Sequence, residues 1–202
     1  MLTNFSCDYT TTIKVLVGPE EQFFVVHKDV ICAKSGHFKA ACSGWKKGGG
    51  EITVHLPGVQ GYVFQHYVDW VYGNTLVATS TVDGNVEMAI KLHLLGGVLD
   101  DVKLRNRTVK ALNSISAIDK IPNAAVTKAI WAITPTNSLL RKWAVGDMIM
   151  RGDRDRFEQA IADYPTEFVQ EVAVKLLKQQ PTTTSKASQA DLREYLEAED
   201  DA

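Results

Sequence analysis

The sequence predicts an α+β fold, with a small β-sheet near the N-terminus and a long series of helices after it. Over residues 12–17, Ile13, Val15 and Val17 alternate with their neighbours, which indicates a strand with one buried apolar row. Gly18-Pro19 breaks this pattern, and the aromatic and β-branched residues 22–26 follow. These two segments predict a β-hairpin with a loop of four to five residues. Beyond residue 60, apolar residues recur at spacings typical of helices.

A third strand and a long helix are predicted next. The alternation Ile52-x-Val54-x-Leu56 is typical of a strand, and Pro57-Gly58 ends it. The following segment has helical spacing and a wide buried face. We expect this face to consist of Val63, Phe64, Tyr67, Val68, Val71 and Tyr72. Gly73-Asn74 should end the helix, because both residues tolerate a left-handed backbone.

Two further helices are predicted between residues 83 and 112. Asp83 or Asn85 can cap the first of them. Its buried stripe is expected to contain Val86, Ala89, Ile90 and Leu94. Gly96-Gly97 is then expected to interrupt the helix. The second helix should turn Val102, Val109 and Leu112 inward.

The remaining chain reads as helices followed by a polar end. Gly152 is predicted to end one helix and Asp153 to cap the next, with Phe157 and Ile161 as its buried face. A later helix carries a double apolar stripe, formed by Phe168, Val172 and Leu176 beside Val169, Ala173 and Leu177. Residues 181–188 are rich in Thr and Ser and lack periodicity, which is typical of a linker. Residues 191–202 carry six acids and one arginine, a balance of −5.

Composition narrows the class of protein. With 202 residues and 45% hydrophobic residues, the chain can bury a substantial core. A net charge of −2 argues against a nucleic-acid partner, which requires clustered Lys and Arg. We expect no membrane span and no secretory leader, because no apolar stretch approaches the required ~20 residues. Cys7, Cys32 and Cys42 are expected to be reduced thiols, so we predict a cytoplasmic or nuclear location.

The residues give little support for a metal site or a catalytic site. His27, Cys32, His37 and Cys42 lie five residues apart, and imidazoles and thiolates are zinc ligands. Five positions rotate a side chain by about 140° around a helix, so successive members point apart unless the chain folds back. Recognisable motifs of thiol proteases, hydrolases and nucleotide-binding loops are also missing. We expect no catalytic residue, cofactor, metal ion or small-molecule substrate, and an enzyme or metal-binding protein is the remote alternative.

The order of these segments resembles a BTB/POZ domain. The resemblance depends on the two strands, Val26-His27-Lys28, Ser35-x-x-Phe38, Ile52-x-Val54-x-Leu56 and the helix over residues 64–73. Residues 92–112 resemble the final helix pair of that domain as found in fungal proteins. Residues 123–178 resemble the helical region that those fungal proteins carry after the domain. The resemblance implies a BTB/POZ domain over residues 1–113 and an all-helical extension over 119–180. The composition of residues 181–202 predicts a flexible linker and acidic tail.

The resemblance implies a non-catalytic adaptor that forms homo- or hetero-oligomers through protein surfaces. Its alternative is a substrate adaptor of a cullin-type ubiquitin ligase. Two departures from the family bear on this choice. Thr12 stands where the family usually has an aspartate, so Lys28 must reach water or another acid. Trp45-Lys46-Lys47 places positive charge where cullin binders commonly carry an acid.

Three segments provide candidate residues for binding a partner. About eleven residues precede the first strand, and they cannot form both the helix and the strand of the swapped dimers in this family. If a dimer forms, its interface should be smaller than the swapped kind or should use this N-terminal segment together with the first helices. The Gly-rich loop presents a tryptophan, which either anchors a partner or folds back onto the second helix. The acidic tail either docks on a neighbouring subunit or is simply solvated. The candidates are Phe5, Tyr9, Trp45, Lys46, Lys47, Leu192, Tyr195 and Leu196.

Overall fold

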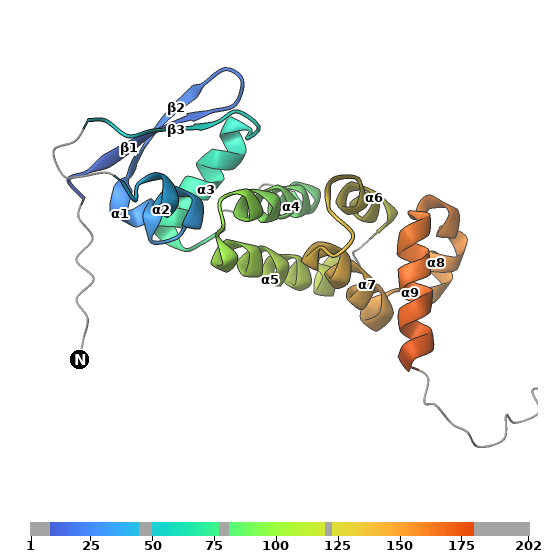
Figure 1. Ribbon diagram of the computed structural model, residues 1–202. Helices are drawn as coiled ribbons and strands as arrows, with labels where there is room; N and C mark the ends of the chain where they lie inside the picture. The colour runs from blue at the N-terminus through green and yellow to red at the C-terminus, as the bar shows by residue number, and fades with distance from the viewer. Residues whose placement is uncertain (1–8, 45–49, 77–80, 120–122, 180–202) are drawn as a thin grey trace, which may run out of the picture.

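The computed structural model describes residues 9–44, 50–76, 81–119 and 123–179 and shows a small sheet at one end of an elongated series of helices (Figure 1). The first part contains β1 (Thr12–Val17), β2 (Gln22–His27), α1 (Lys28–Cys32), α2 (Gly36–Ala41), β3 (Thr53–Leu56) and α3 (Gly61–Gly73). The second part contains α4 (Val82–Val98), α5 (Val102–Asp119), α6 (Ala124–Ile133), α7 (Leu139–Arg151), α8 (Arg154–Gln159), a 3-10 turn (Ile161–Asp163) and α9 (Thr166–Gln179). Within the described ranges, no helix is both long and apolar enough to span a membrane.

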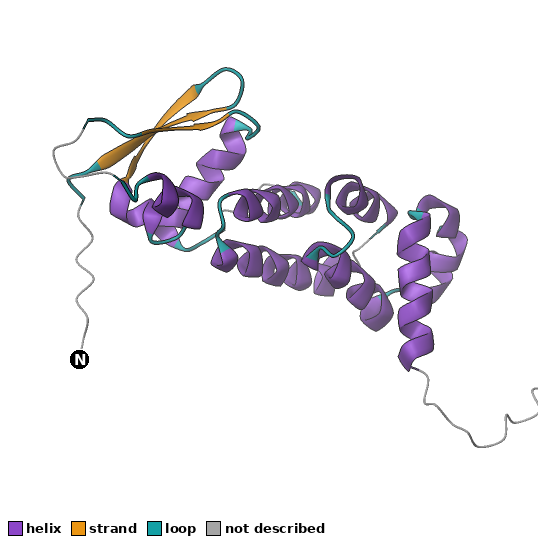
Figure 2. Ribbon diagram, in the orientation of Figure 1, coloured by secondary structure: helices purple, strands orange, loops and turns teal. Residues whose placement is uncertain are grey.

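The sheet confirms the predicted strands. Its order is β2-β1-β3, with β1 antiparallel to β2 and parallel to β3. Residues 18–21 form the hairpin loop, in which Gly18 and Glu21 adopt positive φ. Helices lie against one face of the sheet, and no element of the described ranges covers the other face (Figure 2). The connection from β1 to the parallel strand β3 therefore runs through β2, α1 and α2.

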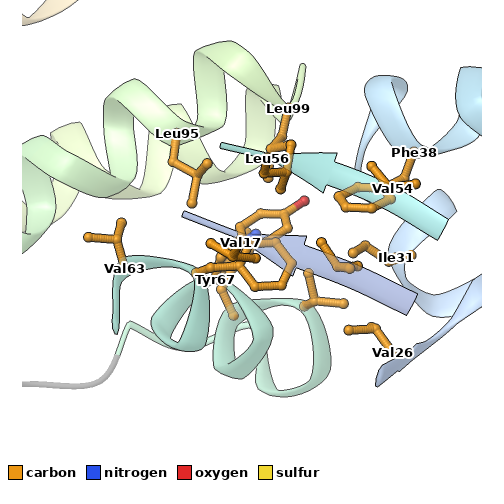
Figure 3. Close-up of a cluster of buried hydrophobic side chains, with 14 of the residues drawn as sticks. Val17, Val26, Ile31, Phe38, Val54, Leu56, Val63, Tyr67, Leu95 and Leu99 are labelled. Atoms are coloured by element: carbon orange, nitrogen blue, oxygen red, sulfur yellow. The ribbon is translucent and has the colours of Figure 1, made fainter. Parts of the chain in front are cut away.

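The first hydrophobic core lies between the sheet and the helices α1 to α4. Ile13, Val15 and Val17 are fully buried, as the alternation predicts. Figure 3 shows how residues from both strands and helices converge there, among them Val26, Phe38, Val54, Tyr67 and Leu99. Aromatic rings provide much of the packing, since Phe64 contacts Phe24, Phe38 and Tyr67. The predicted strand residues thus form one side of a single packed core.

Helix α3 differs from its predicted face at two aromatic residues. Trp70 is buried and was not among the expected core residues, whereas Tyr72 is 44% exposed. The buried carboxylate of Asp101 explains this rotation, because it accepts a hydrogen bond of 2.9 Å from Trp70 Nε1. Tyr72 instead extends to β2, where its hydroxyl accepts the backbone N–H of His27. The prediction that Val63, Phe64, Tyr67 and Val71 are buried is confirmed.

Helices α4 and α5 require three corrections. Thr81, rather than Asp83 or Asn85, caps α4, and its hydroxyl accepts from the backbone N–H of Gly84. Gly96-Gly97 does not interrupt α4, which continues to Val98. Val102 is exposed and Leu104 is buried in its place. The cause is Asp101, whose carboxylate accepts the backbone N–H of Leu104 and so sets the first turn of α5.

A second core joins α4 to the helices that follow. Its largest buried residues include Leu112, Ile130, Leu140 and Phe168, and Val86, Ala89 and Ile90 of α4 pack with them. Helix α4 therefore contributes to both cores, because Leu92 and Leu95 belong to the first. Helix α5 continues unbroken across residue 113, where the sequence places the end of the domain. The predicted domain boundaries stay predictions.

The C-terminal helices confirm the predicted caps and correct two predicted faces. Helix α7 ends at Gly152, and the side chain of Asp153 caps α8 by accepting from the backbone N–H of Arg156. Ile161 is exposed rather than buried. Leu176 and Leu177 are also exposed, because α9 buries Phe168 and Val172 in its first half and its second half extends beyond this core. The predicted double stripe is therefore covered along only half of its length.

Candidate protein-interaction surface

Of the eight predicted binding residues, the structure places Tyr9. Phe5, Trp45, Lys46, Lys47, Leu192, Tyr195 and Leu196 lie outside the described residues. Tyr9 stands just before β1 and is 60% exposed. Its ring meets the edge of the His27 ring, with 5.3 Å between the ring centroids. Tyr9 thus belongs to an aromatic group at the end of the sheet.

This aromatic group consists of Tyr9, His27 and Tyr72. The Tyr72 hydroxyl accepts the backbone N–H of His27 at 3.0 Å and lies 2.7 Å from His27 Nδ1. Because the hydroxyl accepts the backbone bond, it can donate to Nδ1, which leaves the imidazole proton on Nε2. The neighbouring Lys28 lies 3.8 Å from Asp29, measured from Nζ to Oδ1, so it finds another acid in place of the missing aspartate at position 12. The group presents two exposed phenol rings to solvent.

The face of the sheet away from the helices carries an apolar patch. Phe23 and Val25 of β2 are 54% and 52% exposed, and Leu16 of β1 is half-buried beside them. Lys14 lies over the Phe23 ring at 5.8 Å from its centroid and pairs with Glu51. The sequence does not identify this face, because both faces of β2 carry apolar residues and periodicity cannot separate them. The feature of the sequence that could have indicated this exposed patch is the lack of any Lys, Arg, Asp or Glu in β2.

A groove of about 530 Å³ lies between α4 and α6. Its floor and walls are mostly aliphatic and include Val86, Ile90, Ala129 and Ile133. Glu87 and Lys91 also line the groove and form an ion pair in which Nζ lies 2.5 Å from Oε1. Their hydrogen bond is the main cause of the raised pKa of Lys91, with a further contribution from Tyr62. A partner that enters this groove meets an apolar surface with one defined pair of charges.

Helix α6 has the composition of a helix buried on more than one side. Thr127 and Lys128 are its only polar residues, and Thr127 is buried. Its exposed positions carry Ala125, Ala129, Ala132 and Ile133, with Lys128 as the one exposed polar residue within the helix. This bias was visible in the sequence, but only the tertiary structure shows which side of α6 remains open.

A second groove, of about 590 Å³, lies between α7 and α9 and is more polar. Lys142, Lys175 and Lys178 line it together with Glu167 and Glu171. Val174 also lines this groove, and Leu177 lies exposed on the same helix. The mixture of charges favours a polar contact in this groove. The α4/α6 groove is the more apolar of the two.

Two buried side chains, Arg141 and Asp101, link helices of the described chain through hydrogen bonds. Arg141 donates to the carbonyl oxygens of Trp131 and Thr134 and to Glu167, and so joins α6, α7 and α9. The Asp101 carboxylate joins α3 to α5, and burial together with this carboxylate raises the pKa of Tyr67. These contacts hold α3 to α5 and α6 to α7 and α9.

The residues considered for zinc binding are engaged in other contacts. Burial and a hydrogen bond to Cys42 raise the pKa of the Cys32 thiol to about 12, which keeps it protonated at neutral pH. His27 is bonded to Tyr72, and the His37 ring packs against the edge of Phe38. Within the part of the chain that the structure describes, no three His, Cys, Asp or Glu side chains gather as metal ligands.

Part of the chain matches the model of a known protein family. Residues 2–99 match the family model of the BTB/POZ domain, which covers both strands of the hairpin and every element up to the end of α4. A search of curated proteins found no match.

Proposed function

We propose that this chain is a non-catalytic adaptor that holds a second copy or another protein. The family model that residues 2–99 match, the BTB/POZ domain, is a module for protein–protein interaction and oligomerisation. The observation that carries this proposal is the amount of apolar surface that stays open on an ordered framework. Phe23 and Val25 on the sheet and Ile133 in the α4/α6 groove are each about half exposed. Exposed apolar patches of this kind are typical of interaction sites.

The α4/α6 groove is the part of the surface best suited to a protein side chain or helix. Covering aliphatic surface contributes roughly 25 cal/mol per Å² of area removed from water. The Lys91 and Glu87 pair lining the groove can then orient a polar residue of the partner. We infer that an apolar segment of the partner binds here and that the adaptor role needs no catalytic residue.

The helices after the domain extend the same surface. We propose that α6 to α9 correspond to the helical region of fungal BTB/POZ proteins, which rests on the sequence resemblance over residues 123–178. These helices pack on α4, so the domain and the helices after it could form one continuous docking surface. Such a surface supports the alternative function, a substrate adaptor whose partner is a cullin. The charges of Lys46 and Lys47 disfavour that alternative. A purified cullin N-terminal domain that binds in isothermal titration calorimetry would support it.

The adaptor role can be tested with a groove variant. We expect Ile133→Lys to lose a protein partner that the native chain captures in cells, because the lysine places a charge in the apolar groove. Met150→Lys is the matched control, since Met150 is exposed on α7 outside both grooves. Binding is then measured with the purified partner. A native chain that neither self-associates nor binds any protein specifically would overturn the adaptor role.

We also propose that the protein acts in the cytoplasm or nucleus, as its three cysteines suggest. Fluorescence microscopy of a tagged chain would show this directly, and accumulation in the secretory pathway would contradict it.

A further inference from the structure

Strand β2 has an open edge whose backbone direction can be determined. The N–H of Lys28 donates to the carbonyl of Thr11 across the hairpin, and on the other side of β1 the N–H groups of Lys14 and Gly18 donate toward β3. Odd-numbered residues of β1 therefore face β2, and they pair with the even-numbered residues of β2. The odd-numbered residues Phe23, Val25 and His27 consequently direct their N–H and C=O groups away from the sheet. Among the described residues, β2 is an outer strand, because the order is β2-β1-β3.

The contact at His27 confirms this direction. Its backbone N–H leaves the sheet and reaches the hydroxyl of Tyr72 at 3.0 Å. Phe23 and Val25 show no comparable contact among the described residues. Their side chains lie half exposed on the uncovered face of the sheet. Two residues of β2 thus offer unpaired backbone groups and apolar side chains at the same place.

This edge lacks the usual protection against strand pairing. Proteins commonly guard an open edge with lysine, proline or a bulge, because unpaired backbone groups invite another strand. The sequence of β2 is Gln-Phe-Phe-Val-Val-His, which contains none of the charged residues or prolines that serve this purpose. All six residues of β2 pair with β1 in regular register. An edge of this kind is suited to accept a strand.

We propose that β2 pairs antiparallel with β2 of a second copy, about a two-fold axis at Phe24. This inference rests on the proposed function, since it names the surface by which the module self-associates. In this register Phe23 lies opposite Val25 of the second copy, and Val25 lies opposite its Phe23. Each such pair exchanges both backbone hydrogen bonds, and the aromatic and β-branched side chains meet on one face. The His27 to Tyr72 bond stays intact because the new bonds use Phe23 and Val25 alone.

The charges at the two ends of β2 favour a second copy in this orientation. Glu20 lies at the hairpin end, and Lys28 lies at the other end beside Asp29. Antiparallel pairing about Phe24 brings Glu20 near Lys28 of the second copy. Parallel pairing would instead place acid beside acid. Between these ends β2 is neutral, so two copies approach without like-charge repulsion.

A lysine on the edge tests the surface. We expect Val25→Lys to raise the dimer dissociation constant by about tenfold or more, because it places a charge against Phe23 of the second copy. Val98→Lys is the matched control, since Val98 is 59% exposed at the end of α4. Sedimentation equilibrium over a range of concentrations gives the constants, and thermal unfolding verifies that both variants fold.

Paired cysteines test the register. In a hydrogen-bonded antiparallel pair the Cα atoms lie about 5.5 Å apart, within the range of a disulfide. The double variant Phe23→Cys with Val25→Cys should therefore form a covalent dimer when a mild oxidant is added. Each disulfide forms from two thiols, which pass two electrons and two protons to the oxidant. Each single variant should cross-link no more than the native chain, because it brings no two introduced thiols together.

The outcomes separate this inference from the adaptor role. A native chain that stays monomeric up to about 100 µM overturns the β2 dimer, while capture of another protein would still support the adaptor role. A Val25→Lys variant that dimerises as tightly as the native chain also overturns the proposed surface. Cross-linking of a single variant as strongly as the double variant overturns the register. A weakened Val25→Lys dimer and a double variant that cross-links selectively are the results that we expect.

Discussion

At the scale of single residues, the buried Asp101 positions parts of two helices. It is almost completely buried and follows the turn between α4 and α5. One carboxylate oxygen accepts from Trp70 Nε1 at 2.9 Å and the other accepts from the backbone N–H of Leu104 at 2.8 Å. The same side chain therefore determines which face of α3 is buried and how α5 begins.

We predict that Asp101→Ala lowers the free energy of unfolding by about 2–4 kcal/mol, since it leaves a buried indole N–H and a helix N–H without partners. Asp101→Asn keeps one oxygen acceptor and should have a smaller effect. Urea unfolding followed by tryptophan fluorescence measures both. An Asp101→Ala midpoint equal to that of the native chain would show that the carboxylate does not stabilise this contact.

His93 predicts a dependence of stability on pH. Burial lowers the pKa of its imidazole, which lies in α4 with Nδ1 3.0 Å from the hydroxyl of Thr108. The unfolded chain therefore binds a proton at His93 more readily than the folded chain does. The contribution of neutral His93 to the free energy of unfolding is fully present above its unfolded-state pKa of about 6.5. This contribution decreases as the pH falls below that value.

We expect His93→Gln to reduce the loss of stability between neutral and mildly acidic pH. Comparison of urea unfolding for the native chain and the variant at several pH values isolates the contribution of this residue from those of the other histidines. Parallel curves for the two chains would contradict the assignment to His93.

At the scale of elements, α4 and α5 pack at close distance because of Gly96. A Cβ atom at this position would lie 2.9 Å from Cγ of Arg105 and 3.3 Å from the carbonyl oxygen of Asp101. The second glycine differs, because a Cβ at Gly97 would meet nothing within 4 Å. These neighbouring glycines were expected to interrupt the helix together, yet one permits a helix contact and the other faces open space.

We predict opposite effects for alanine at these two positions. Gly96→Ala should destabilise by about 1–3 kcal/mol through overpacking. Gly97→Ala should stabilise by about 0.5–1 kcal/mol, because alanine favours a helix and no neighbour obstructs it. Thermal unfolding of the two variants provides the comparison. Equal shifts in the same direction would mean that the close approach of α5 does not matter for stability.

At the scale of the whole molecule, α4 and α5 connect the sheet end to the C-terminal helices. Helix α4 contributes to both cores, and α5 is held to α7 by Arg151, which donates to both the carbonyl and the side-chain oxygen of Asn113. Ser116 adds a buried hydrogen bond to Asp147 of α7. The C-terminal helices therefore pack on α4 and α5 through side chains as well as through the chain itself.

This packing predicts the result of limited proteolysis. We expect a stable fragment that ends near Pro181, because the helices up to α9 pack against α4 and α5. Mass spectrometry of the products identifies the cleavage sites. Early cleavage within residues 114–122 that releases two independently folded pieces would show that the extension does not dock on the domain.

Local sequence determined the features that depend on neighbouring residues. The alternation at Ile13, Val15 and Val17, the break at Gly18-Pro19 and the cap at Asp153 each act within one strand or one turn, where the physical cause is short-ranged. The resemblance to the BTB/POZ domain followed from the order of these segments, and the family match confirms it over residues 2–99.

Tertiary structure decided which apolar faces are covered. Both faces of β2 are apolar, so only the position of the helices shows that Phe23 and Val25 stay open. For the same reason, Trp70 replaces Tyr72 in the core and the second half of α9 remains exposed. The physical cause is that burial depends on partners distant in sequence, such as Asp101 for Trp70, whereas periodicity reports only that a helix or strand has an apolar side.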